Sequence, residues 1–270
     1  MTTALSLPIG LSALRNGQSS AQLAACLLLA AWYLFEKRWW WATLWLCLSL
    51  VCKPLGVPAI GLAVMAFPRT WWRVSLGVLV VMGLPYLLAP TGYVNQLYTA
   101  FAANLVDCFN PSGRTFADLN GVLMVLNLKL DGLPSLAVRV IAGCAMAIGC
   151  WRTRDYVPDS KRALIWLAFT GIYIMLFTPM NEGNSYVMLA PSFGLWALWS
   201  VKSGKRTMAK LIGLISILIV VLPDIVGLVL GKDFANEFAK FLYPLLTLLF
   251  LGILLTQMQR NHAETVASCQ

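Results

Sequence analysis

Long apolar runs, separated by short polar breaks, dominate this chain. A membrane-spanning helix needs about twenty mostly apolar residues, so the long runs that end in charged or turn residues predict crossings. The sequence therefore predicts an all-α fold, a polytopic transmembrane helical bundle. The predicted crossings cover residues 19–35, 74–88, 134–151, 163–177, 185–199, 211–230 and 241–257.

Two shorter apolar runs, residues 39–51 and 55–67, follow the first crossing. Each is about thirteen residues long, which is too short for an ordinary helical crossing. Lys53 and Pro54 stand between them, and proline bends the chain because it cannot continue a regular helix. We predict a short half-membrane helical hairpin with Lys53 at its tip.

The segment of residues 93–133 mixes charged and amide side chains with apolar ones. This mixture predicts an extracytoplasmic loop that contains one or two interfacial helices. Residues 1–18 are expected to form an N-terminal extracytoplasmic segment, and residues 260–270 a polar cytoplasmic tail. Because no internal repeat or change of composition divides the chain, we predict a single transmembrane domain over residues 1–270.

Basic residues orient the predicted bundle. They concentrate in alternate breaks, whereas the other breaks are richer in Asn, Asp and Gly. Short loops rich in Lys and Arg stay in the cytoplasm. Basic and non-basic breaks alternate between the two sides of the membrane only if the short hairpin enters the membrane and returns to the side from which it started. We therefore predict a cytoplasmic C-terminus and polar candidate residues on the extracytoplasmic side. The basic breaks are residues 36–38, 69–73, 152–162, 202–210 and the tail from Arg260.

Composition supports the membrane interpretation. Apolar residues make up 59% of the chain and charged residues 11%, with a mean hydropathy of +0.75, values that exclude an ordinary soluble domain. The net charge of +9 does not predict a nucleic-acid partner, because the basic residues lie in the breaks rather than on one stripe. The seven cysteines form no CxxC pair, so neither a disulfide framework nor a metal site is predicted. No cofactor motif is present.

Lys53 is the sharpest candidate for a functional residue. Ionisable side chains among membrane-embedded segments are costly and usually have a function. Its ammonium is suited to bind a lipid phosphate or pyrophosphate as a point charge. The alternative is a lysine whose ammonium reaches the lipid head groups while its stem stays in the apolar layer.

Two turn-like segments carry further binding candidates. Asn16 and Gln18 lie just ahead of a predicted helix start, where free backbone amides suit an anion or sugar hydroxyls. The alternative there is a simple cap and turn. Asn110 belongs to a turn sequence that presents Arg114. Arginine binds phosphate through two parallel hydrogen bonds, although such a loop arginine is equally compatible with solvation or head-group contact.

Three carboxylates are candidates for catalysis. Glu182 lies in the polar break between two predicted crossings, where it would serve as a general base or as a ligand to a bound cation. The alternative is an ordinary exposed turn glutamate. Asp107 and Asp118 are comparable candidates within the loop of residues 93–133.

The order of these motifs resembles glycosyltransferase family 87. The resemblance rests on Gly17-Gln18 opening an apolar helix, the apolar run that ends at Lys53-Pro54, and the following run into Arg69-Thr70-Trp71-Trp72-Arg73. The loop of residues 110–123, which includes Ser112 and Asn120, is similar to the family's external loop. The segment of residues 178–186, which ends at Tyr186 ahead of a proline-bearing helix, is similar to its late motif.

The resemblance implies a function and a location. The family comprises polyprenol-linked sugar transferases with the GT-C membrane fold, including bacterial mannosyltransferases. It implies transfer of a hexose such as mannose from a polyprenyl-phosphate donor to a lipid or envelope-glycan acceptor, on the extracytoplasmic face of a bacterial inner membrane. Lys53 and Arg114 would hold the donor phosphate, and a carboxylate would accept the proton of the acceptor hydroxyl. The expected substrate-binding set also includes Asn16, Gln18, Asn110, Asn120 and Tyr186.

One departure from the family leaves a second class of function open. GT-C enzymes carry a catalytic aspartate in the first external loop, and no such loop precedes Arg15. The chain is therefore expected to be a fragment, a reduced homologue, or a subunit whose partner chain supplies the missing N-terminal helices and the base. The alternative is a non-catalytic membrane protein, such as a lipid-linked-sugar translocase or an accessory subunit of envelope glycan assembly.

Overall fold

A computed structural model describes residues 19–109, 116–128, 130, 132–179 and 181–268. Within these residues the chain is mainly helical and contains no strand, which confirms the all-α prediction. The elements are α2 (Ser20–Phe35), α3 (Trp39–Cys52), α4 (Gly56–Ala66), η1 (Pro68–Thr70), α5 (Trp71–Leu88), α6 (Thr91–Phe109), α7 (Leu119–Val125), α8 (Gly132–Tyr156), α9 (Asp159–Phe177), η2 (Gly183–Leu189), α10 (Ala190–Lys202), α11 (Arg206–Leu230) and α12 (Lys232–Ser268).

The described helices confirm a polytopic membrane bundle. Five helical segments of this part of the chain are long and apolar enough to cross a membrane. Three further helices, α2, α3 and α4, are apolar but shorter. The five long segments are Pro68–Leu88, Gly132–Tyr156, Asp159–Phe177, Arg206–Leu230 and Lys232–Gln259.

The predicted short hairpin is formed by α3 and α4. These helices have 14 and 11 residues, so at a rise of about 1.5 Å per residue both are shorter than the hydrocarbon core of about 30 Å. Helix α3 ends because Lys53 is extended, with φ −155° and ψ 147°. Gly56 permits the close return, since a Cβ there would lie 2.6 Å from the Leu50 backbone nitrogen. The depth of the hairpin in the bilayer stays a prediction.

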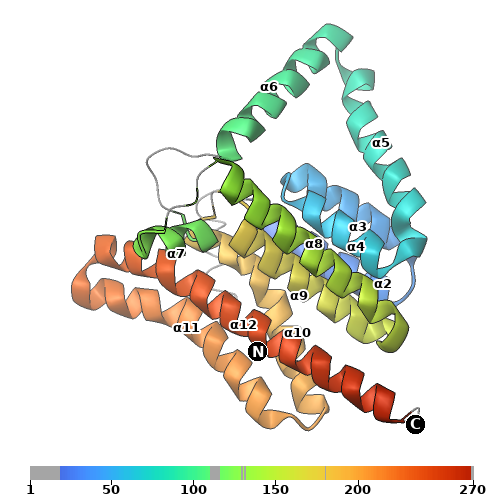
Figure 1. Cartoon of the computed structure of the whole chain (residues 1–270). Helices are drawn as coiled ribbons and strands as arrows, with labels where there is room; N and C mark the ends of the chain where they lie inside the picture. Colours follow the sequence, from blue (N-terminus) through green and yellow to red (C-terminus); the bar gives the residue numbers. More distant parts are fainter. Residues whose placement is uncertain (1–18, 110–115, 129, 131, 180, 269–270) are drawn as a thin grey trace.

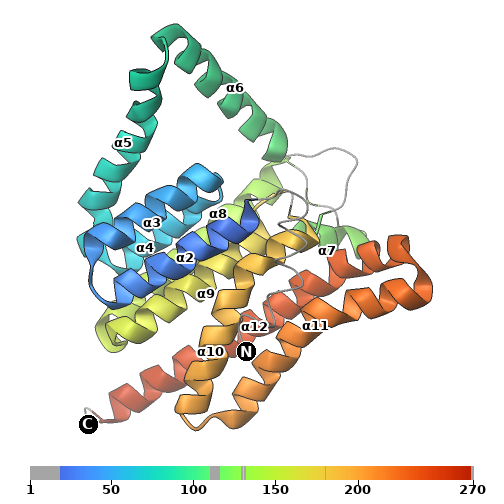
Figure 2. The ribbon, with the colours of Figure 1, turned by 180° about the vertical axis from the view of Figure 1, so that it is seen from behind.

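Helix α9 occupies the middle of the bundle, with α2, α4, α8, α10 and α12 packed around it (Figures 1 and 2). The fully buried Trp166 of α9 donates a hydrogen bond from Nε1 to the Ala59 carbonyl of α4, at 3.0 Å. Ser192 of α10 donates to the Leu167 carbonyl at 3.3 Å. These bonds connect both the short hairpin and the C-terminal half to the central helix.

Helices α5 and α6 form an arch that leaves the bundle and returns to it (Figure 1). Only Val74 of α5 is buried. At the apex, Tyr86 donates to Asn95 Oδ1 and Tyr98 donates to the Met82 carbonyl, both at 2.7 Å. The segment of residues 93–133, expected to be a loop with one or two helices, thus contains α7 and a long α6. The exposed apolar surface of α5 is typical of a helix that faces lipid.

The breaks toward the C-terminus are more helical than the sequence indicated. Residues 232–240 of the expected break at residues 231–240, and most of the expected polar tail, belong to α12. Glu237 and Lys240 lie three residues apart and form an ion pair on that helix, a spacing that supports helical structure. The expected crossing of residues 185–199 begins as the 3₁₀ helix η2 and continues as α10, where Pro191 stands at the helix start and needs no donor.

The breaks lie at two opposite ends of the bundle, as the charge alternation predicted (Figure 1). At the basic end, Lys37 forms an ion pair with Asp159 at 2.8 Å, and the Arg162 guanidinium lies 5.5 Å from the Phe67 ring centroid. At the other end lie the start of α2, the tip of the α3–α4 hairpin, η2 and α7. Which end faces the cytoplasm stays a prediction.

Candidate functional site

The tip of the α3–α4 hairpin is hydrogen-bonded to the first residues of α2 and its N-cap. Lys53 donates a hydrogen bond from Nζ to Ser20 Oγ at 2.8 Å. Ser19 donates from Oγ to the Cys52 carbonyl at 3.1 Å. The Lys53 ammonium is therefore held beside the N-terminus of α2, where the positive end of the helix dipole favours an anion.

Lys53 and Glu182 are brought together although they are far apart in the sequence. Burial lowers the pKa of Lys53 from the ordinary lysine value of 10.5, and the negative charge of Glu182 acts in the opposite direction. Glu182 is exposed and directly precedes η2, which packs against α2. The arrangement places an exposed carboxylate within electrostatic range of a half-buried ammonium.

A buried asparagine fixes the segment that carries Glu182. Asn181 donates from Nδ2 to the carbonyls of Ile174 and Thr178, at 2.6 and 3.0 Å, and so satisfies carbonyl groups at the C-terminal end of α9. The Asn181 carbonyl accepts a hydrogen bond from the Ala117 amide at 2.8 Å. Tyr186 donates its hydroxyl to the Ala117 carbonyl at 2.9 Å. The loop before α7 and the segment before η2 are thus joined.

Asp118 caps α7 beside this junction. Its side chain accepts a hydrogen bond from the Gly121 amide at 2.8 Å, as an N-cap residue does. Only 5% of Asp118 is exposed. Burial raises the pKa of its carboxyl, while the Gly121 bond and the positive charge of Arg139 act to lower it. The immediate role of Asp118 in this structure is to organise α7.

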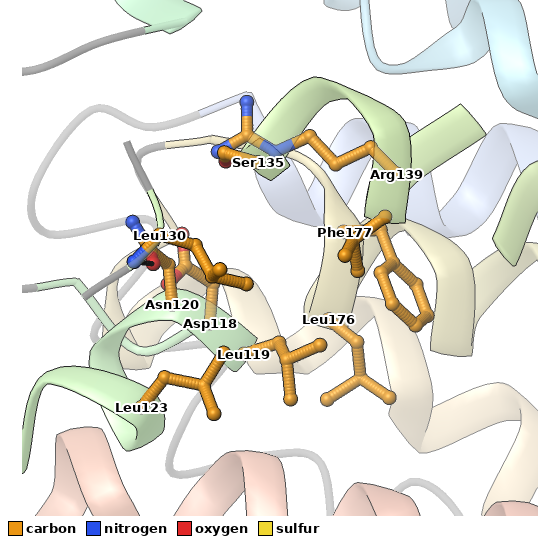
Figure 3. Close-up of a pocket in the computed structure, with 10 residues that line it drawn as sticks. Asp118, Leu119, Asn120, Leu123, Leu130, Ser135, Arg139, Leu176 and Phe177 are labelled. Atoms are coloured by element: carbon orange, nitrogen blue, oxygen red, sulfur yellow. Dashed lines mark hydrogen bonds between the residues drawn. The ribbon is translucent and has the colours of Figure 1, made fainter. Parts of the chain in front are cut away.

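A pocket opens between α7 and the start of α8. Its empty volume of about 260 Å³ includes open solvent, so it is a shallow depression rather than an enclosed cavity. Figure 3 shows Arg139 and Ser135 on one side, and Asp118 and Asn120 on the other. The Asn120 Oδ1 accepts a hydrogen bond from the Leu130 amide at 3.3 Å. The pocket combines polar and charged groups with an apolar floor that includes Leu123, Leu176 and Phe177.

The structure therefore gathers five of the predicted site residues at one end of the bundle. They are Lys53, Asp118, Asn120, Glu182 and Tyr186. Asp107 is exposed on α6, the helix of the arch, and is not part of this group. The other predicted residues lie outside the described part of the chain: Asn16, Gln18, Asn110 and Arg114.

Sequence reasoning missed two residues of the site. Arg139 lines the pocket and is 9% exposed, and its position inside the predicted crossing of residues 134–151 was the signal that could have identified it, because a charged residue there is costly. Asn181 was included in the polar break, but its bonds to α9 depend on the fold and had no local signature.

A comparison with known families decides the identity of the chain. The sequence model of glycosyltransferase family 87 matches residues 1–179. The chain belongs to this family. The match confirms the resemblance carried by Lys53-Pro54 and the Arg69 to Arg73 cluster. It also covers Asp118 and Arg139, whereas Glu182 lies just beyond it. Neither the curated proteins nor the solved structures contain a significant match to the chain.

The geometry of this family 87 protein suits the two tasks of sugar transfer. A transferase must stabilise the negative charge that develops on the leaving group and must accept a proton from the attacking hydroxyl. The Lys53 ammonium can perform the first task and an exposed carboxylate such as Glu182 the second. Both groups lie at the end of the bundle that carries few basic residues.

Proposed function

We propose that this family 87 protein transfers a hexose from a polyprenyl-phosphate carrier to a hydroxyl of a lipid or envelope-glycan acceptor, on the extracytoplasmic side of the membrane. Mannose is the first sugar to test. The observation that carries the proposal is the meeting of Lys53 with Ser20 and with the charge of Glu182 at one end of the bundle.

The donor phosphate binds at the tip of the short hairpin. The Lys53 ammonium donates a hydrogen bond to a neutral hydroxyl, that of Ser20, and its positive charge would attract an incoming phosphate. The positive end of the α2 dipole lies at the same position. A hairpin that ends within the bilayer would bring this cation to the level where the head group of a polyprenyl carrier lies. Arg114, with Asn16, Gln18 and Asn110, remains a predicted contributor to donor binding.

Glu182 acts as the general base in this proposal. Its carboxylate takes the proton from the acceptor hydroxyl, whose oxygen then forms a bond to the anomeric carbon of the sugar. The bond between that carbon and the phosphate oxygen breaks, and the electron pair leaves with the phosphate, which Lys53 stabilises. Glu182 is preferred over Asp118, whose buried carboxylate caps α7, and over Asp107 on the arch.

The shallow pocket between α7 and α8 adds polar groups that would contact part of the sugar or the acceptor beside this centre. Asn120 and Arg139 offer hydrogen-bond groups at its wall, and the hydroxyl of Tyr186 holds the preceding loop in position. In this arrangement Asp118 is a positioning residue, because it acts through the conformation of α7.

The test is a transfer assay on the purified chain, with radiolabelled polyprenyl-phosphate mannose as donor and membrane lipid extract as acceptor. Glu182→Gln is expected to lower the transfer rate by about a hundredfold or more, the usual contribution of a general base, with donor affinity retained within about twofold. Glu237→Gln removes another exposed carboxylate and serves as the matched control with unchanged activity.

Two results would redirect the proposal. Equal transfer rates for wild type and Glu182→Gln would remove Glu182 from the chemistry. Donor binding by wild type without any transfer would favour the alternative, a lipid-linked-sugar translocase or an accessory subunit that works with a partner chain. Adding membranes that contain the candidate partner would then restore transfer if that chain supplies the base.

A further inference from the structure

A second cluster of charged and aromatic side chains lies at the opposite, basic end of the bundle. The Arg73 guanidinium carbon lies 4.4 Å from the ring centroid of Trp72 and 5.4 Å from that of Trp40. The two rings are perpendicular, with centroids 5.2 Å apart. The first turns of α3 and α5 thus hold one guanidinium against two indole rings.

A close approach of α5 to α3 positions this cluster. A Cβ at Gly77 would lie 2.5 Å from Cys47 Sγ and 3.2 Å from the Thr43 methyl carbon. Glycine at this position therefore lets the two helices come together one turn below the cluster. The position of the cluster is therefore set by the packing of α3 against α5.

The positive charge of Arg73 has no paired acid among the described residues, whereas the neighbouring Arg69 lies within electrostatic range of the Asp159 carboxylate. Arg73 donates from Nη1 to the Arg69 carbonyl at 2.5 Å, and its buried Nε has no hydrogen-bond partner. In the part of the chain that the structure describes, no ion pair involves Arg73. The neighbouring cations differ, because Lys37 is paired with Asp159 and Arg38 with Glu36.

An exposed apolar stripe continues from each tryptophan. Trp40 and Trp72 are 55% and 41% exposed. Leu44 follows Trp40 by four positions and Leu76 follows Trp72 by four, and both leucines are exposed. Residues four apart share one face of a helix, so each apolar stripe begins at a tryptophan of the cluster and continues along the same helix face to a leucine. Tryptophan at such a boundary is typical of the membrane interface.

We propose that Arg73, Arg69, Trp40 and Trp72 bind the phosphate of an anionic glycerophospholipid in the adjacent leaflet, with the lipid's acyl chains along the Leu44 and Leu76 stripes. Arginine binds phosphate through parallel hydrogen bonds and stacks on aromatic rings. An acidic protein segment would satisfy the guanidinium groups but would leave the apolar stripes without a matching partner. This site is separate from the proposed sugar-transfer centre and does not depend on it.

Native mass spectrometry of the full chain in detergent, titrated with phosphatidylglycerol or phosphatidylcholine, tests the proposal. Wild type is expected to bind phosphatidylglycerol more tightly than phosphatidylcholine. Arg73→Gln is expected to lower the phosphatidylglycerol affinity about tenfold, and Arg73→Lys by less, because lysine keeps the charge and loses the planar fork. Arg152→Gln removes one exposed charge from the same end and is expected to change the affinity less than about twofold.

An unchanged phosphatidylglycerol affinity in Arg73→Gln would overturn the proposal. An equal loss of affinity in Arg152→Gln would overturn it too, because the lipid would then respond to the overall positive charge of this end and not to the Arg73 cluster. Binding of an octaglutamate peptide to wild type that is lost in Arg73→Gln, with lipid affinity unaffected, would indicate a protein partner instead. If Arg73→Gln loses helical circular dichroism, Arg69→Gln replaces it, because Arg69 is exposed, with an expected loss of about threefold or more.

Discussion

The Lys53 ammonium and the Ser20 hydroxyl are 2.8 Å apart, joined by a hydrogen bond that spans 33 residues of sequence. This bond connects the tip of the short α3–α4 hairpin to the first turn of α2. It gives the hairpin a fixed position in the bundle and gives the lysine a fixed direction. The proposed donor site follows from this relationship.

Replacing Ser20 by alanine tests how far this bond positions the lysine. Ser20 is fully buried, and a hydrogen bond to a charged group contributes about 1.5–3 kcal/mol. Ser20→Ala is therefore expected to weaken polyprenyl-phosphate binding by about tenfold, measured by equilibrium binding in detergent. Ser75→Ala removes an exposed hydroxyl that bonds within α5 and should leave binding unchanged. Equal affinities for all three proteins would show that Ser20 does not position Lys53.

The pH dependence of donor binding should report the protonation of Lys53. Burial lowers the pKa of this lysine below 10.5. Binding that needs the ammonium is complete below the lowered pKa and is lost as pH rises through it. In Lys53→Arg the alkaline loss should disappear, because a guanidinium stays charged throughout this range. An alkaline loss of binding that persists unchanged in Lys53→Arg would assign it to another group.

Gly121→Ala should disrupt the loop that carries Asp118. A Cβ at this position would lie 2.0 Å from the Phe116 carbonyl oxygen, and forcing atoms into a packed site costs about 1–3 kcal/mol. The expected result is a lower thermal unfolding temperature. Gly83→Ala in α5 is the control, since nothing lies within 4 Å of a Cβ there. Equal unfolding temperatures for Gly121→Ala and wild type would contradict the observed conformation of the loop.

Accessibility of single cysteines tests the predicted orientation. In a background without the native cysteines, Glu182→Cys should react with a membrane-impermeant maleimide added outside intact cells. Ser203→Cys, at the basic end of α10, should react only after the cells are opened. The basic loops predict this pattern because they stay in the cytoplasm. The reverse pattern would place the candidate site on the cytoplasmic side.

The sequence predicted the helices whose ends are determined by neighbouring residues. Apolar length and the Lys53-Pro54 break predicted the short hairpin, and α3 and α4 confirm it. Prediction failed where a polar segment is itself helical. The break at residues 231–240 reads as polar, yet Glu237 and Lys240 form an ion pair along α12. Polarity indicates contact with water, which a helix that extends past the membrane also has.

The site could be predicted only in part. Lys53, Asp118 and Glu182 were chosen as candidates because polar residues between apolar runs are uncommon, and their functional roles stay predictions. The meeting of Lys53 with Glu182 depends on the packing of η2 against α2, which no local pattern specifies. Asn181 was overlooked for the same reason, because its carbonyl partners become available only where α9 ends.

The proposed role of Lys53 in holding the donor phosphate is tested by the binding of polyprenyl-phosphate mannose to wild type and to Lys53→Ala, measured in the same detergent. Lys232→Ala is the matched control, because it removes an exposed lysine at the start of α12. Lys53→Ala is expected to lower donor affinity about tenfold or more, with Lys232→Ala equal to wild type. A Lys53→Ala protein that is folded and binds the donor as tightly as wild type would contradict it.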